Sequence, residues 1–100
     1  MIDPEQCRTM AEVRRGVDQV DDEIVKLLAR RFRFMEAAAR VKPTRDQVRD
    51  ERRKAEVIDR VSGAARDTAI PDDFIVQLYE TLVERSIAYE FDRFDARSEA

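Results

Sequence analysis

The sequence contains 100 residues, of which 43% are hydrophobic and 41% are charged, and this composition predicts a single, soluble, highly helical domain over residues 1–100. The formal net charge of -3 excludes an overall basic field that would attract nucleic acid or an anionic membrane, so any anion must bind to a local cluster. With Cys7 as its only cysteine and no histidine, the chain cannot form an internal disulfide or a histidine-based catalytic triad, and no zinc site is expected.

The first ten residues, MIDPEQCRTM, include two acids and lack the apolar run of a secretory signal. No apolar run elsewhere approaches the roughly 20 residues that a membrane-spanning helix needs. We therefore expect a cytoplasmic protein without a membrane segment, and we interpret Cys7 as an ordinary thiol near the start of a helix.

A long amphipathic helix is predicted from about Met10 to Lys42. Its apolar residues recur mostly at alternating steps of three and four, and no glycine or proline interrupts the chain between Val17 and Lys42. Pro43 disfavours helical geometry at Lys42, so the helix should end there. The apolar positions are Met10, Val13, Val17, Val20, Ile24, Leu27, Phe34, Met35, Ala38 and Val41.

This helix is too long to be covered by its own chain. About 33 residues at about 1.5 Å each extend over roughly 50 Å, whereas a compact domain of this size has a radius of gyration of about 13 Å. Only about 58 residues follow the helix. We therefore expect much of its apolar stripe to pack on a second copy, in an interlocked homodimer.

Two further helices are predicted after a loop at about residues 43–48. The second helix carries Gly63 near its C-terminal half and is followed by a connection at about residues 66–69. The third helix should begin at residues 70–73, where a proline and two acids suit a helix N-terminus, and the polar tail at residues 95–100 should fray. The second helix runs through Arg53, Val57, Ile58, Val61 and Ala65, and the third presents Ile75, Leu78, Tyr79, Leu82, Ser86, Tyr89, Glu90 and Arg93 at helical spacing.

Cations interrupt the apolar stripe of the first helix. Arg31 and Lys42 are eleven residues apart, about three turns, and so lie on nearly the same side. The alternative is that both extend to the edge of a dimer core without binding anything. Arg14 lies about 25 Å before Arg31 and can share a site with it only in a crossed dimer, and otherwise it would pair with Asp18 at the surface.

Two polar residues continue the apolar face of the third helix. Ser86 and Glu90 are one turn apart, and a carboxylate on that face is costly unless it is paired, protonated or functional. The alternative for Glu90 is a surface pair with Arg93. Glu84 and Arg85 are interpreted as ordinary surface charges, and the charge run of Asp50, Arg52, Arg53 and Lys54 as a solvated helix start.

These interruptions coincide with a family pattern. The segment VRRGVDQVDDEIVKLLARRFRFMEAAARVK contains an Arg, then Asp-x-x-Asp-x-x-Ile, then Leu-Leu-x-x-Arg and a closing Lys. Together with VRDERRKAEVIDRV and FIVQLYETLVERSIAYE, it resembles the all-helical chorismate mutases over nearly the whole chain. The resemblance implies an intertwined dimer with three helices per chain. It also implies a site in which Arg14 comes from the partner subunit and one chain supplies Arg31, Lys42, Asp50, Arg53, Ser86 and Glu90.

The resemblance implies that the substrate is the dicarboxylate chorismate, which rearranges to prephenate. This pericyclic reaction needs no covalent intermediate and no cofactor, so the protein supplies orientation and electrostatics, and no metal or organic cofactor is expected. Arginines 14, 31 and 53, helped by Ser86, would bind the two carboxylates. Lys42 would stabilise the negative charge that grows on the ether oxygen. Glu90 would be a second donor to that oxygen and must be protonated to donate, so we expect activity to rise toward acid pH.

One position departs from the family pattern. After Arg53 many mutases carry Glu, which helps to hold the ring hydroxyl of the substrate. This chain has Lys54 at that position, and Asp50 could make the contact with the hydroxyl instead.

The opening PEQC and the AAARVK segment also resemble isochorismate-pyruvate lyases of the same fold, which eliminate pyruvate from isochorismate to give salicylate. The spacing of Ser86 and Glu90 favours the mutase, and the lyase is the alternative. A non-catalytic dimerisation module is a third hypothesis, and it predicts that Arg31 and Lys42 tolerate alanine.

Overall fold

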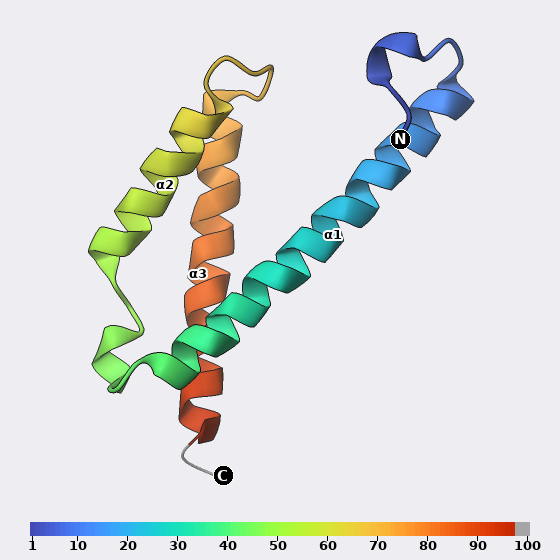
Figure 1. Ribbon diagram of the computed structural model, residues 1–100. Coiled ribbons are helices and arrows are strands. Elements are labelled where there is room, and N and C mark those ends of the chain that lie inside the picture. Colours follow the sequence, from blue (N-terminus) through green and yellow to red (C-terminus); the bar gives the residue numbers. More distant parts are fainter. Residues whose placement is uncertain (98–100) are drawn as a thin grey trace. The chain divides into compact units, whose positions relative to one another are not determined.

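The computed structural model describes residues 1–97, and these form three α-helices and no β-strand (Figure 1). The predicted all-α fold with a very long first helix is thereby confirmed. Helix α1 ends one residue before the predicted end, and a short 3-10 turn occupies the loop that follows it. The elements are a 3-10 turn at Pro4–Gln6, α1 at Met10–Val41, a 3-10 turn at Arg45–Gln47, α2 at Glu51–Ala65 and α3 at Asp72–Arg97.

The chain divides into two compact units, Met1–Arg33 and Phe34–Ala100, and the boundary between them falls within α1. Every helix in residues 1–97 is too short or too polar to cross a membrane.

In the first unit, the N-terminal segment folds back onto the start of α1. The backbone N–H of Ile2 donates to Oε1 of Gln19 at 3.1 Å, and a Cβ added at Gly16 would lie 3.4 Å from the Ile2 side chain. Thr9 and Glu12 cap the helix reciprocally, because the Glu12 N–H donates to the Thr9 hydroxyl at 3.2 Å and that hydroxyl donates to the Glu12 carboxylate at 3.1 Å. The sequence analysis did not predict this fold-back.

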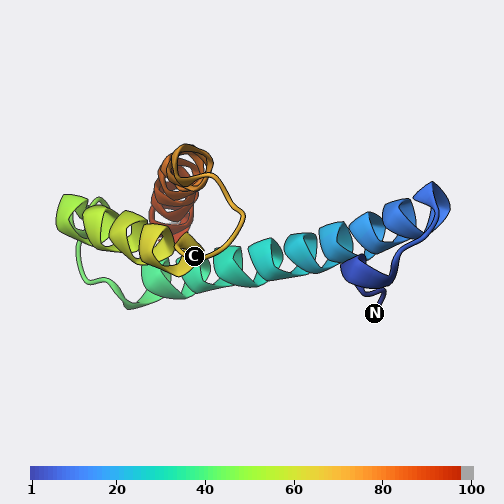
Figure 2. The same cartoon turned by 90° about the horizontal axis from the view of Figure 1, so that it is seen from above.

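In the second unit, α2 and α3 lie side by side as an antiparallel pair (Figures 1 and 2). Asp50 begins α2, since its side chain accepts a hydrogen bond from the backbone N–H of Arg53 at 3.0 Å. The connection to α3 turns at Asp67, whose φ of 68° is the left-handed conformation that Asp adopts more readily than most residues. This pairing brings the start of α2 beside the middle of α3.

The end of α3 differs from the prediction. The tail was expected to fray from Asp95, but the helix continues through Arg97. Asp95 forms an ion pair with Arg45 at 2.8 Å, and the Arg97 guanidinium donates to the backbone oxygens of Ala39 and Lys42 at 2.8 and 2.6 Å. These contacts satisfy carbonyl groups at the end of α1 and hold the last turn of α3. The final three residues of the predicted tail lie outside the described residues.

The apolar core of the described chain is small. Its buried hydrophobic residues are Ala39, Val48, Ala65 and Val83, and no large side chain among residues 1–97 is fully buried. Leu27 keeps 60% of its surface exposed. Other large apolar residues of α1 are similarly exposed, among them Met10, Val17, Val20, Ile24 and Val25.

Candidate active site

An ion pair between Lys42 and Glu90 lies at the centre of the candidate site. Nζ of Lys42, next to the end of α1, is 2.7 Å from Oε2 of Glu90 on α3. The Glu90 side chain is 5% exposed and the Lys42 side chain 27%. A carboxylate buried this deeply needs a cationic partner, and Lys42 supplies it. The alternative pairing of Glu90 with Arg93 at the surface is therefore wrong.

Two backbone oxygens accept hydrogen bonds from side chains of the candidate site. The Lys42 ammonium also donates to the backbone oxygen of Val48 at 3.3 Å, and Val48 itself is buried. Ser86, one turn before Glu90, is 2% exposed, and its hydroxyl donates to the backbone oxygen of Leu82 at 2.6 Å. The half-buried Lys42 is thus bound to α3 through Glu90, and Ser86 is a second buried polar residue one turn earlier on that helix.

Asp50 and Arg53 occupy the first turn of α2. The Asp50 carboxylate is engaged as the cap of that helix, whereas the Arg53 side chain is 64% exposed and lies 3.5 Å from Glu56. The Arg53 guanidinium is therefore close to its sequence neighbours in a weak surface ion pair, which a ligand carboxylate could displace at small cost.

Arg14 and Arg31 both lie on α1, in the unit Met1–Arg33. Arg14 is exposed and Arg31 is half-buried. Their separation of seventeen residues along one straight helix corresponds to about 25 Å, so a single copy of α1 does not bring them together. Within residues 1–97, the alternative ion pair of Arg14 with Asp18 does not form.

A cluster of charges joins the start of α2 and the residues before it to α3. Arg49 binds Glu84 through two guanidinium nitrogens, at 2.7 and 3.2 Å, and binds Glu51 at 2.7 Å. Lys54 lies 2.9 Å from both Glu80 and Glu84, and its side chain is only 18% exposed. The interpretations of Lys54 as solvated and of Glu84 as an ordinary surface charge are therefore wrong. The signal in the sequence was the pair of acids one turn apart on α3, Glu80 and Glu84, which Arg49 before α2 and Lys54 within it could reach.

This cluster shifts the ionisation of its members. Hydrogen bonds from Arg49 and Lys54 lower the pKa of Glu84 from 4.5 to about 2. Hydrogen bonds to Glu80 and Glu84 raise the pKa of Lys54. The carboxylate and both cations therefore remain charged throughout the neutral range.

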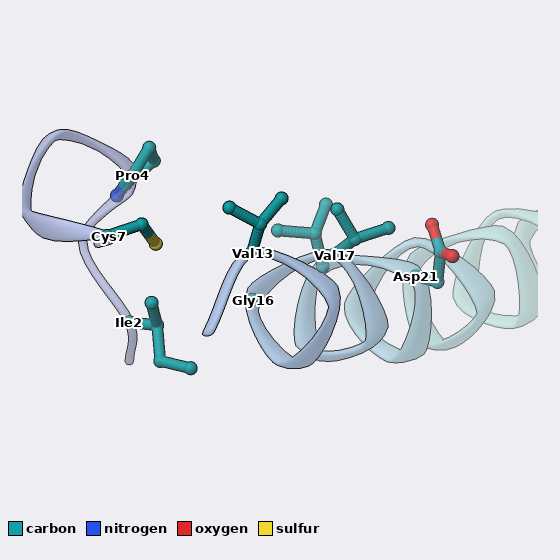
Figure 3. Close-up of a pocket in the computed structure, with 8 residues that line it drawn as sticks. Ile2, Pro4, Cys7, Val13, Gly16, Val17 and Asp21 are labelled. Carbon is teal, nitrogen blue, oxygen red and sulfur yellow. The ribbon is translucent and has the colours of Figure 1, made fainter. Parts of the chain in front are cut away.

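Two of the hollows in residues 1–97 bear on where a ligand could bind. An open one of about 440 Å³ borders Lys42 and is lined mainly by the polar loop that precedes α2. Another of about 300 Å³ lies in the first unit, where Ile2 and Cys7 of the N-terminal segment face Val13 and Val17 of α1 (Figure 3). Its lining is mostly apolar and includes the carboxylate of Asp21, so it does not suit a dicarboxylate ligand. In residues 1–97, no cluster of three or more Cys, Asp or Glu side chains could hold a metal ion.

Residues 13–91 match the sequence profile of the family described as Chorismate mutase type II. The chain belongs to this family. All seven predicted site residues of this chorismate mutase type II protein fall within the matched stretch.

Two curated relatives of this chorismate mutase type II protein carry different names. An isochorismate pyruvate lyase from Pseudomonas aeruginosa is 27% identical over 88 residues, which cover 88% of this chain and 87% of the relative. A chorismate mutase from Methanocaldococcus jannaschii is 23% identical over 82 residues, which cover 81% of this chain and 83% of the relative. The similarity to both extends over most of each chain.

Proposed function

We propose that this chain is a chorismate mutase, formed as one domain over residues 1–100, which rearranges chorismate to prephenate without a cofactor. The observation that carries the proposal is the buried Lys42–Glu90 pair at 2.7 Å in a member of the chorismate mutase type II family. In the reaction, the ether C–O bond breaks while a C–C bond forms, and no atom enters or leaves. Negative charge develops on the ether oxygen, and a fixed ammonium group at that point lowers the barrier.

The residues have distinct proposed roles. Lys42 donates to the ether oxygen, and Glu90 donates to the same oxygen when it carries a proton. The substrate carboxylates are bound through paired hydrogen bonds by Arg31, Arg53 and Arg14 of the partner subunit, with help from Ser86. Asp50, at the start of α2, is proposed to hold the ring hydroxyl through the carboxylate oxygen that does not cap the helix.

The homodimer is part of this proposal. The exposed apolar side chains along α1 and the small core of the described chain favour a second copy as their cover. A crossed pair of α1 helices would then let Arg14 of one chain reach the Arg31 region of the other.

Isochorismate pyruvate lyase activity is the second candidate function. It is favoured by the similarity to the Pseudomonas aeruginosa relative. Lys54, which stands where many mutases carry glutamate, binds Glu80 and Glu84 of α3 and supplies no carboxylate for the ring hydroxyl of chorismate. In the lyase reaction the same C–O bond breaks, and a ring hydrogen moves to the enolpyruvyl carbon, which gives salicylate and pyruvate. A cationic site suits both reactions because both build charge on the departing oxygen.

Separate incubations of the purified protein with chorismate and with isochorismate test the proposal, with prephenate, salicylate and pyruvate measured. We expect prephenate from chorismate, and we expect Lys42→Ala to lower kcat by about 100-fold or more, since losing one donor to a developing oxyanion typically costs on the order of 100- to 1,000-fold. Lys26→Ala is the matched control, because the Lys26 side chain is 74% exposed. Salicylate and pyruvate as the main products would favour the lyase, and turnover of neither compound would reject both activities.

A further inference from the structure

The loop before α2 supplies one of the two acceptors that hold the Lys42 ammonium. Val48 lies in this loop and is 2% exposed, and its backbone oxygen accepts a hydrogen bond from Nζ of Lys42 at 3.3 Å. The other acceptor, Glu90, belongs to α3. The direction of the ammonium group therefore depends on where the loop lies relative to α3.

Arg49 ties this loop to α3. Its guanidinium makes a forked contact with Glu84, with Nη2 at 2.7 Å from Oε1 and Nη1 at 3.2 Å from Oε2. A forked arginine–carboxylate contact fixes direction as well as distance, which a single lysine contact does not. Glu84 lies two residues before Ser86 and six before Glu90 on the same helix, so the loop is fastened to the part of α3 that carries the site.

Arg49 is not the only residue that binds Glu84. Lys54 of α2 shares the Glu84 carboxylate at 2.9 Å and also binds Glu80. The loop has another tie near its beginning, where Arg45 pairs with Asp95, but both of those side chains are more than half exposed. Arg49 directly follows Val48 in the sequence, so its contact with Glu84 restrains the Val48 carbonyl group most directly.

We propose that Arg49 is a positioning residue for the reaction at Lys42, because its forked contact with Glu84 holds the loop at residues 43–50 so that the Val48 oxygen orients the Lys42 ammonium. Arg49 itself touches neither substrate nor the reacting atoms in this proposal. The kinetic part of the test rests on the proposed function, whereas the structural part does not.

The test compares Arg49→Ala, Arg49→Lys and the matched control Arg52→Ala. Arg52 is the same residue type three positions away, its side chain is 92% exposed, and it makes only a 3.7 Å ion pair with Glu56 of its own helix. Steady-state kinetics with chorismate measure kcat and KM. Hydrogen exchange at the amides of Gln47 and Val48, which donate to the backbone oxygens of Thr44 and Arg45, measures the order of the loop directly.

We expect Arg49→Ala to lower kcat by about tenfold or more with a smaller change in KM, because misplacing a catalytic group by about 1 Å can cost on the order of 100-fold. Exchange at Gln47 and Val48 should rise while the α3 amides keep their protection. Arg49→Lys should recover part of both effects, and Arg52→Ala should match the wild type. Thermal unfolding of each variant confirms that the compared proteins are folded at the assay temperature.

Unchanged exchange at Gln47 and Val48 in folded Arg49→Ala would overturn the proposal whether or not the protein turns over chorismate. Equal losses of kcat in Arg49→Ala and Arg52→Ala would also overturn it, since that result would indicate a general effect of charge. If the wild type turns over neither chorismate nor isochorismate, the proposed function fails, and the exchange measurement still decides whether Arg49 orders the loop.

Discussion

Lys42 and Glu90 contact each other directly. The 2.7 Å contact and the 5% exposure of the Glu90 side chain place a carboxylate where the substrate oxygen would compete for the same ammonium. A glutamate that only accepts hydrogen bonds would repel a developing negative charge, whereas a protonated one can donate to it. The proposed chemistry therefore requires Glu90 to take up a proton when substrate is bound.

Glu90→Gln tests this requirement. We expect kcat/KM of the wild type to rise as the pH is lowered from mildly alkaline to mildly acid, because only a carboxyl that carries a proton can donate a hydrogen bond to the ether oxygen. The amide of glutamine donates at every pH, so the profile of the variant should be flat over the same range. The measurement is kcat/KM for chorismate across pH, and identical profiles for both proteins would contradict the role assigned to Glu90.

At the scale of the elements, α2 and α3 are joined by charge as well as by packing. Few hydrophobic residues of the two helices are buried, and those that are, Ala65 of α2 and Val83 of α3, are not large. Arg49 and Lys54 converge on Glu84, and this convergence lowers the pKa of the Glu84 carboxyl to about 2. A carboxylate that binds its proton less tightly in the folded chain than in the unfolded chain makes stability depend on pH.

The sign of that dependence follows from the two pKa values of Glu84. Its contribution to the free energy of unfolding is complete above the ordinary value of 4.5 and is lost as the pH falls through about 2. We expect the Tm of the wild type to fall more steeply across this interval than the Tm of Glu84→Gln. Glu23→Gln is the control, because Glu23 makes only an exposed 3.7 Å pair with Lys26, and its Tm should follow the wild type. Parallel curves for the wild type and Glu84→Gln would show that the cluster adds no acid-sensitive stability.

At the scale of the whole molecule, α1 carries more apolar surface than one chain covers. Ile24 keeps 46% of its surface exposed and Leu27 60%, and the described core contains only small or medium side chains. Exposed apolar surface on this scale is typical of an interface between subunits. The proposed dimer would provide that cover and would bring two copies of Arg14 to two sites.

Mixing inactive variants tests whether Arg14 acts in the partner's site. Arg14→Ala and Lys42→Ala should each be nearly inactive alone, because each removes a group from both sites of its homodimer. In a mixed dimer, one site would retain both residues. Random mixing by joint refolding should restore about a quarter of wild-type activity, since about half of the dimers are mixed and each has one intact site. If the mixture stays as inactive as its components, Arg14 does not act across the dimer.

The sequence by itself determined the helices and most of their ends, because these depend on neighbours a few residues apart. Apolar spacing indicated α1, α2 and α3, and Pro43 marked the end of α1 within one residue. The extension of α3 through Arg97 could not be predicted in the same way, since it depends on contacts with Arg45 and the carbonyl groups at the end of α1.

For the candidate site, the sequence determined which polar residues interrupt the apolar faces, and it singled out Lys42, Ser86 and Glu90 among them. Only the tertiary structure decided their partners: Glu90 binds Lys42 across 48 positions rather than Arg93 three residues away, and Glu84 binds Arg49 across 35. Helical periodicity shows which side of its own helix a residue occupies but not which residue of another helix faces it. That second relation depends on how the loops place one helix against the next, so long-range ion pairs emerge only from the folded chain.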